Sequence, residues 1–275
     1  MNLLTIDLEE WYIYQLYNKG ESDFYLPIIE SILDNILNLL DEYNYKASFF
    51  CLGIIARRYP KIIKKINERG HDIGCHSDLH TFISFQSKSE FRDETRIAID
   101  SLQQLIGRDI NMYRAPAFTI SEKTKWALEV LAELNIEYDC SIFPVKRSFG
   151  GWGSFPTAYP VLIQTSSGVI KELPINYYKF CGSRIIYTGG GYFRLIPYFF
   201  IETLMKESNY NMAYFHIRDF DSAQKRVHSF RYLKSYLGVK GAFRKFEQII
   251  RNNEFLSISQ ASNIINWDNV KTINV

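Results

Sequence analysis

The sequence predicts an α/β fold in which the strands of a parallel sheet alternate with helices. Through the first two thirds of the chain, short apolar runs alternate with amphipathic stretches, which is typical of consecutive βα units. Polar residues suited to catalysis recur where the apolar runs end. The chain has 275 residues, 47% of them hydrophobic, and a single α/β barrel commonly has this size. We therefore expect one domain over residues 1–275.

The N-terminal part repeats a strand followed by a helix. Residues 3–7 form a short apolar run, and residues 26–40 place leucine and isoleucine at helical spacing. Residues 46–52 read as the next strand. Pro60 is a preferred first residue of a helix and Gly70 a preferred residue after its end, so we expect a helix between them. Residues 71–76 are again strand-like.

The middle of the chain continues this alternation. Residues 87–105 have helical apolar spacing, and residues 111–114 make a short strand. Ser121 is expected to cap a helix that runs to Leu134, and residues 136–142 follow as a strand.

Glycine and serine mark a change near residue 150. Residues 150–167 are predicted to form loops or hairpins, because these residue types favour turns. The remaining expected elements are strands at 169–173, 212–216 and 255–258, helices at 197–207 and 240–251, and a last helix from Ser259.

Composition excludes several classes of protein. The 32 basic and 30 acidic residues leave a formal charge of +2, which does not favour nucleic acid as a partner. No apolar stretch is long enough to span a membrane, and the first residues lack the apolar segment of a signal peptide. The four cysteines show no CxxC spacing and are expected to be reduced. We therefore expect a cytoplasmic protein, with peripheral contact at the inner membrane face as the alternative.

Polar side chains fall at the carboxyl ends of several predicted strands. Asp7, His76, Arg114 and His216 each end a strand, and Asp139 lies within the start of another. The carboxyl ends of parallel strands open onto one face of a barrel, where active sites are built. The sequence therefore predicts that these residues share one site.

Two histidines within this set have the spacing of metal ligands. His76 and His80 are four residues apart, which would place both imidazoles on one side of a helical turn. Glu9, on the neighbouring strand end beside Asp7, supplies a carboxylate. Two imidazoles and one carboxylate leave a coordination position open for water, as in catalytic zinc sites. We expect a divalent metal, zinc before other transition metals.

The order of these motifs resembles that of the polysaccharide deacetylase family, also called the NodB-homology or carbohydrate esterase 4 family. The resemblance covers residues 3–220 and rests on Thr5-Ile6-Asp7-Leu8-Glu9, Gly70 to His80, Arg114-Ala115-Pro116-Ala117-Phe118 and Phe215-His216. The run Gly189 to Arg194 further resembles a subgroup found with bacterial exopolysaccharide and surface-glycan synthesis. The resemblance implies a distorted (β/α)7 barrel, completed or decorated by the helices and strand of residues 229–275.

The family's chemistry implies a role for each polar residue. Asp7 would be the general base that takes a proton from water, and Arg114 would pair with Asp7 and keep it ionised. His216 would protonate the departing amine. A backbone N–H near Ala117 would stabilise the tetrahedral oxyanion together with the metal.

The sequence departs from the family pattern at two motifs. Asp7 is followed by Leu8, Glu9 and Glu10 in place of two adjacent aspartates, so Glu9 is the expected metal ligand and Glu10 its rival. Ile142 and Phe143 stand where the family has an Asp-Trp pair. This leaves Asp139 and Asp219 as the two candidates for the carboxylate that orients His216.

The resemblance also implies a substrate. We expect removal of an acetyl group from an N-acetylated sugar of a surface polysaccharide, lipopolysaccharide or glycoconjugate precursor, nucleotide-linked or lipid-linked. Substrate contacts are expected from residues around the site, namely Ala117, Phe118, Gly190, Tyr192 and Arg218. Two alternatives remain, a metal-free cyclic-amide or other C–N hydrolase on the same barrel, and a catalytically silent sugar-binding barrel.

Overall fold

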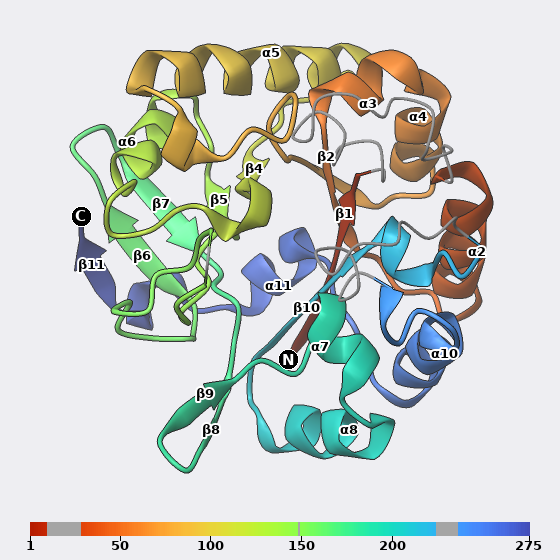
Figure 1. The fold of residues 1–275 in the computed structure, drawn as a ribbon. Coiled ribbons are helices and arrows are strands. Elements are labelled where there is room, and N and C mark those ends of the chain that lie inside the picture. The colour runs from red at the N-terminus through yellow and green to blue at the C-terminus, as the bar shows by residue number, and fades with distance from the viewer. Residues whose placement is uncertain (10–28, 148, 224–235) are drawn as a thin grey trace.

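The fold is organised around one mostly parallel sheet. A computed structural model describes residues 1–9, 29–147, 149–223 and 236–275. Within these residues, nine strands form a sheet in the order β10-β1-β2-β3-β4-β5-β7-β6-β11, and a separate hairpin contains β8 and β9. Figure 1 shows β1 and β10 in the middle of the molecule, with helices α2, α3, α4, α5 and α10 outside them.

The strands are short, and the helices between them vary from one to five turns. The strands are β1 Asn2–Leu8, β2 Ser48–Cys51, β3 Asp72–Cys75, β4 Met112–Tyr113, β5 Tyr138–Asp139, β6 Val161–Gln164, β7 Val169–Glu172, β8 Tyr178–Phe180, β9 Ser183–Ile185, β10 Asn211–His216 and β11 Thr272–Asn274. The α-helices are α2 Ile29–Glu42, α3 Gly53–Arg58, α4 Pro60–Glu68, α5 Lys88–Ile106, α6 Trp126–Glu133, α7 Gly190–Leu195, α8 Tyr198–Glu207, α10 Ala242–Asn252 and α11 Ile258–Ile264.

The register of the central strands sets the position of the site. β1 runs parallel to β10 on one side and to β2 on the other. In this register Asp7 lies directly beside His216 and beside Phe50. β1 is buried along nearly its whole length, which explains why it reads as a continuous apolar run. The strands predicted at 3–7 and 212–216, far apart in the sequence, are therefore neighbours in the sheet.

The long helix α5 shows how local sequence fixes these elements. Its apolar positions, including Phe91 and Leu102, pack into the core. Ser87 and Glu90 form a capping box at its beginning, and Gly107 closes its end in the left-handed conformation. The observed bounds agree with the expected helix at 87–105.

Several predicted boundaries were wrong, because local hydrogen bonds end or begin elements differently. Ser121 does not cap α6, which begins at Trp126, because Thr124 accepts a hydrogen bond from the Ser121 N–H and holds a turn there. The strand expected at 136–142 contains only Tyr138–Asp139. The strand expected at 255–258 is a single bridge between Leu3 and Leu256, because Ser257 caps α11 one residue later.

The loops or hairpins expected at 150–167 contain β6, which forms an antiparallel hairpin with β7. The predicted elements did not include α3, α7, the β8–β9 hairpin or β11. β11 pairs in parallel with β6, so the C-terminal residues extend the main sheet. Among the described helices, none has the length and apolar content needed to cross a membrane.

Candidate active site and metal centre

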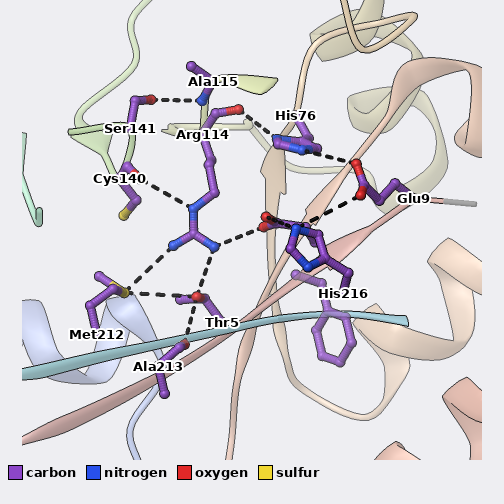
Figure 2. Close-up of polar contacts among 12 residues, drawn as sticks. Thr5, Glu9, His76, Arg114, Ala115, Cys140, Ser141, Met212, Ala213 and His216 are labelled. Atoms are coloured by element: carbon purple, nitrogen blue, oxygen red, sulfur yellow. Dashed lines mark hydrogen bonds and ion pairs between the residues drawn. The ribbon is translucent and has the colours of Figure 1, made fainter. Parts of the chain in front are cut away.

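The structure brings the predicted polar residues together at the carboxyl ends of β1, β3, β4 and β10. Asp7 lies at the end of β1, His216 ends β10, and His76 and Arg114 each follow the last residue of their strand. Figure 2 shows the rings of His76 and His216 facing Glu9, with the Arg114 side chain extending from beside His76 toward Thr5. Asp7, His76, Arg114 and His216 therefore lie together at this face, and their roles in one active site stay predictions.

Glu9, His76 and His80 form a compact group of metal-binding atoms. One donor atom from each lies within 4.8 Å of the other two, and all three side chains are buried. Glu9 Oε2 lies 2.7 Å from His80 Nε2 and 3.8 Å from His76 Nε2. Glu10 lies outside the described residues, so its rivalry with Glu9 stays a prediction.

Hydrogen bonding orients His76 as a ligand. Its Nδ1 lies 2.7 Å from the backbone oxygen of Arg114, so an Nδ1–H donates there and Nε2 presents its lone pair to Glu9 and His80. A backbone carbonyl behind the ring is a common way to fix a metal-binding histidine.

The Glu9 carboxylate is ionised despite its burial. Burial would raise its pKa, but the Arg218 guanidinium and the two imidazoles outweigh burial, and the pKa of Glu9 lies well below its usual value. Neither oxygen of Glu9 has a partner in hydrogen-bond geometry within the described residues, although both lie close to cationic or imidazole nitrogens. A buried carboxylate facing two imidazole nitrogens in this way fits a divalent cation.

The loop between the two histidines is not the helical turn that the spacing suggested. Ser77 and His80 both adopt positive φ angles, of 70° and 62°. The His80 N–H donates to Ser77 Oγ, which closes the loop across three residues. The imidazole rings then meet edge to face with centroids 5.2 Å apart. Left-handed backbone, which the sequence does not signal, thus replaces helical geometry.

The first turn of α3 holds this loop from outside. The N–H groups of Gly53 and Ile54 donate to the backbone oxygens of Ser77 and Asp78. A Cβ at Gly53 would lie 2.2 Å from Asp78 Oδ1 and 2.8 Å from the Cα of Ala98, so only glycine fits. The loop that carries His76 and His80 is therefore held in place by α3, a helix that contributes no candidate metal ligand.

Asp7 and Arg114 form a buried ion pair. Arg114 Nη1 donates to Asp7 Oδ1 at 2.8 Å and to Thr5 Oγ1 at 2.8 Å, and Nε donates to the backbone oxygen of Cys140 (Figure 2). The guanidinium also lies 4.3 Å from the centroid of the Phe50 ring. Arg114 is fully buried, and Asp7 is 2% exposed. The predicted pairing of these two residues is confirmed, and it fixes one carboxylate oxygen of Asp7.

His216 is oriented by Asp219. Its Nδ1 lies 2.9 Å from Asp219 Oδ2, and its backbone N–H donates to the same oxygen. Arg194 lies 3.1 Å from the other oxygen of Asp219. Burial would raise the pKa of Asp219, but His216, Arg194 and Arg218 together hold it below its usual value. His216 Nε2 consequently faces Asp7 Oδ2 at 3.7 Å.

Asp139, the other candidate partner of His216, was the wrong choice. It ends β5 and accepts a hydrogen bond from Ser141, whose oxygen in turn accepts the N–H of Ala115. Burial raises the pKa of Asp139, and burial and Asp139 together raise the pKa of the neighbouring Glu172 well above its usual value. Asp139 thus supports the backbone beside Arg114.

The expected substrate contacts fall in different places. Ala117 is partly exposed beside the site and has a positive φ of 51°, while Phe118 is buried against Tyr214 and packs behind the site. A Cβ at Gly190 would lie 3.7 Å from His216 Cε1, so Gly190 borders the site. Tyr192 is 39% exposed on α7.

Arg218 was expected to contact substrate, but its Nη1 lies 2.5 Å from Glu9 Oε1. Arg218 therefore balances the charge of the Glu9 carboxylate. Sequence reasoning also missed Arg194 and Thr5. Arg194 follows the triple glycine that was noted, and Thr5 precedes Asp7 on the same face of β1, a period-two relation that strand geometry could have indicated.

Two kinds of chemistry can be combined in this arrangement. One carboxylate oxygen of Asp7 is held by Arg114, and His216 presents Nε2 beside the other oxygen. The adjacent cluster of two imidazoles and one carboxylate has the donor set of hydrolytic metal sites. A carboxylate, an imidazole and a candidate set of metal ligands therefore lie together at one face of the sheet.

Comparisons with known proteins agree with this geometry. Residues 7–138 match the model of the polysaccharide deacetylase family, and residues 140–263 match a domain of unknown function, DUF3473. A peptidoglycan-N-acetylglucosamine deacetylase of Bacillus cereus is 36% identical over 117 residues, which are 41% of this chain and 42% of the relative. The matched part thus spans less than half the length of that curated relative.

Solved structures share the fold at low sequence identity. A polysaccharide deacetylase from Mycobacterium smegmatis superposes with a TM-score of 0.69 at 18% identity, over 99% of this chain and 92% of that chain. A structure described as a CE4 family pseudoenzyme from Bacillus anthracis has a TM-score of 0.50 at 10% identity, over 99% of this chain and 66% of that chain.

These likenesses establish the architecture and the family. The mostly parallel sheet with outer helices is the distorted (β/α)7 barrel that the motifs predicted. Residues 7–138 match the polysaccharide deacetylase family.

Proposed function

We propose that this protein is a metal-dependent hydrolase that removes the acetyl group from an N-acetylated sugar. The observation that carries the proposal is the buried group of Glu9, His76 and His80 beside the Asp7–Arg114 pair and the His216–Asp219 pair. A sugar-binding protein needs no such combination of ligands, base and acid.

The metal ligands would be Glu9 Oε2 and the Nε2 atoms of His76 and His80. A divalent cation bound there supplies a Lewis acid that polarises the acetyl carbonyl and acidifies water. Arg218 balances the charge of Glu9, and Arg114 keeps Asp7 in place with one oxygen available to the site.

Proton transfer is then divided between two residues. Asp7 accepts the proton of the attacking water, because its Oδ2 faces the site while Oδ1 is held by Arg114. His216 donates the proton from Nε2 to the departing amine, and the Asp219 carboxylate stabilises the imidazolium before that transfer. Ala117 is the proposed source of a backbone N–H for the oxyanion.

The proposed substrate is an N-acetylated sugar unit of a surface polysaccharide, lipopolysaccharide or glycoconjugate precursor, including nucleotide-linked and lipid-linked forms. The Bacillus cereus relative, named for its action on N-acetylglucosamine in peptidoglycan, supports the N-acetyl sugar. We also propose that residues 1–275 act as one catalytic domain, because Leu4 donates a backbone hydrogen bond to Leu256 and β11 extends the main sheet.

Acetate release from N-acetylglucosamine oligomers and N-acetylated polysaccharides in the presence of zinc tests the proposal. We expect release by the native protein and none by Asp7→Asn, while Asp7→Asn still binds metal. His71→Ala is the matched control, because His71 is buried outside the site and accepts the Ala47 N–H. Full activity of Asp7→Asn would refute the base assignment, and metal-independent release would favour the metal-free hydrolase. No release from any member of the panel, with metal bound, would favour the silent sugar-binding barrel.

A further inference from the structure

A second cavity lies away from the metal centre. It has a volume of about 480 Å³ and lies between the β8–β9 hairpin, the end of α8 and the loop before β6. Its lining includes Lys179, Glu207 and four tyrosines, namely Tyr159, Tyr177, Tyr178 and Tyr187. This volume is within the range of pockets that bind small molecules, about 300–1,000 Å³.

Hydrogen bonds place the cavity at the opposite end of strand β10 from the catalytic residues. Asn176 and Tyr187, which line the cavity, both bond Asn211, the first residue of β10. His216 is the last residue of β10, about 17 Å away at roughly 3.3 Å per residue. Figure 1 shows the β8–β9 hairpin and α8 on the side of the molecule away from α3 and α5.

The floor of the cavity is rigid. The Asn176 amide donates to Tyr187 Oη and to Asn211 Oδ1, and its oxygen accepts the N–H of Met212. Asn176 and Tyr187 are 3% and 1% exposed. Tyr177 is held from one side by the Arg184 guanidinium, 4.8 Å from the ring centroid. A ligand would therefore meet a surface that is already formed, which lowers the cost of binding.

The rim is open and aromatic. Tyr159 is 54% exposed and Tyr178 is 37% exposed, so both rings present apolar surface to solvent. Lys179 and Glu207 add one charge of each sign, so the lining favours neither an anion nor a cation. Flat aromatic rings among mixed hydrogen-bonding groups suit a neutral, polyhydroxylated ring with apolar C–H faces, which is the chemistry of a sugar.

We propose that this tyrosine cavity, lined by Tyr159, Tyr177, Tyr178 and Tyr187, binds a sugar unit of a glycan at a distance from the metal centre. The identity of the ligand as a glycan rests on the proposed function. The cavity anchors long chains while the metal centre acts on another unit, so its contribution appears with long substrates and vanishes with short ones.

A titration with the tetrasaccharide of N-acetylglucosamine tests the proposal. The protein carries ¹³C-labelled tyrosine rings and one of two inactivating substitutions, Asp7→Asn or His216→Ala. Both variants are prepared so that the titration can still be made if one of them does not fold. Cavity resonances are assigned by Tyr159→Ala and Tyr178→Ala, and Phe180→Ala is the matched control, since Phe180 is exposed on the same hairpin outside the lining.

We expect the cavity tyrosines to shift on titration. Loss of either rim ring should weaken binding about tenfold, as removal of an aromatic anchor does elsewhere, and Phe180→Ala should leave it unchanged. In the active protein, Tyr159→Ala should raise KM for a long glycan and leave kcat, and the kinetics of a disaccharide, unaltered. Absence of tyrosine shifts in both backgrounds, together with acetate release by the native protein, would overturn the cavity proposal alone. Tyrosine shifts in these backgrounds, together with no acetate release by the native protein, would support the cavity and refute the proposed function.

Discussion

Replacement of Arg114 by methionine is expected to destabilise the protein far more than replacement of an exposed arginine. Arg114 is fully buried and its partner Asp7 is 2% exposed, so the variant leaves a buried carboxylate without its cation. Breaking a buried pair by removing one member typically costs about 3–5 kcal/mol. The lost hydrogen bonds to Thr5 and the Cys140 carbonyl act in the same direction.

A double-mutant cycle separates the ion pair from packing. Asp7→Asn retains an oxygen that can accept from Arg114, and the double variant removes both charges. We therefore expect the double variant to be at least about 1 kcal/mol more stable than the sum of the single effects predicts, because neither charge is left unpaired. Urea unfolding, followed by tryptophan fluorescence and circular dichroism, gives the four free energies of unfolding.

Arg92→Met is the matched control. Arg92 pairs with Glu133, and each side chain is 31% exposed, so this pair should contribute at most about 1 kcal/mol. Equal stability of Arg114→Met and Arg92→Met, or strict additivity in the cycle, would refute the buried ion pair as the feature that holds Asp7.

Three further substitutions test neighbouring parts of the structure. Gly53→Ala should lower the free energy of unfolding by about 1–3 kcal/mol and weaken zinc binding, because its Cβ would collide with Asp78; urea unfolding and zinc titration measure both. Arg218→Met should weaken zinc binding about 10–100-fold, and more at pH 6 than at pH 8, because the pKa of Glu9 rises without the guanidinium; competition with a chromophoric chelator measures it. Glu172→Gln should reduce the loss of stability between about pH 5 and pH 8 by up to about 1.4 kcal/mol per pH unit, as urea unfolding at several pH values would show.

The sign of the last effect follows from the pKa of Glu172, which is raised in the folded protein. A raised pKa stabilises the fold fully below the unfolded value and loses that contribution as pH rises through the folded value. Glutamine cannot ionise, so the variant lacks this dependence. Identical pH profiles for the native protein and Glu172→Gln would contradict the raised pKa of Glu172. A loss of zinc affinity in Arg218→Met that does not depend on pH would contradict the action of Arg218 through Glu9. Gly191→Ala is the control for Gly53, since its Cβ would meet nothing nearer than 3.6 Å.

The positions of the main site residues followed from sequence because strand ends are a local feature. Asp7, His76, Arg114 and His216 each end an apolar run, and parallel pairing then brings them together. The sequence does not determine which carboxylate reaches His216. Asp219 does so because a short 3₁₀ turn, Ile217–Phe220, returns it to the His216 ring and backbone.

Other features required the folded chain. Ser77 and His80 adopt positive φ angles although neither is glycine, the residue type that usually indicates such a conformation. The spacing of the two histidines therefore suggested a helical turn. Arg218 contacts Glu9 across the β1–β10 pair, a long-range contact that no spacing encodes. The tyrosine cavity depends on the β8–β9 hairpin, whose residues are mostly exposed. Such strands lack the alternation of buried and exposed residues by which a strand is predicted from sequence.

The most direct test of the account is the metal content of the native protein compared with a His76→Ala/His80→Ala variant. Elemental analysis follows purification and dialysis against zinc, with His71→Ala as the control for removal of a buried histidine elsewhere. We expect about one equivalent of zinc in the native protein and in His71→Ala, and none above background in the double variant. A native protein that binds no metal, or a double variant that retains a full equivalent, would contradict the metal centre formed by Glu9, His76 and His80.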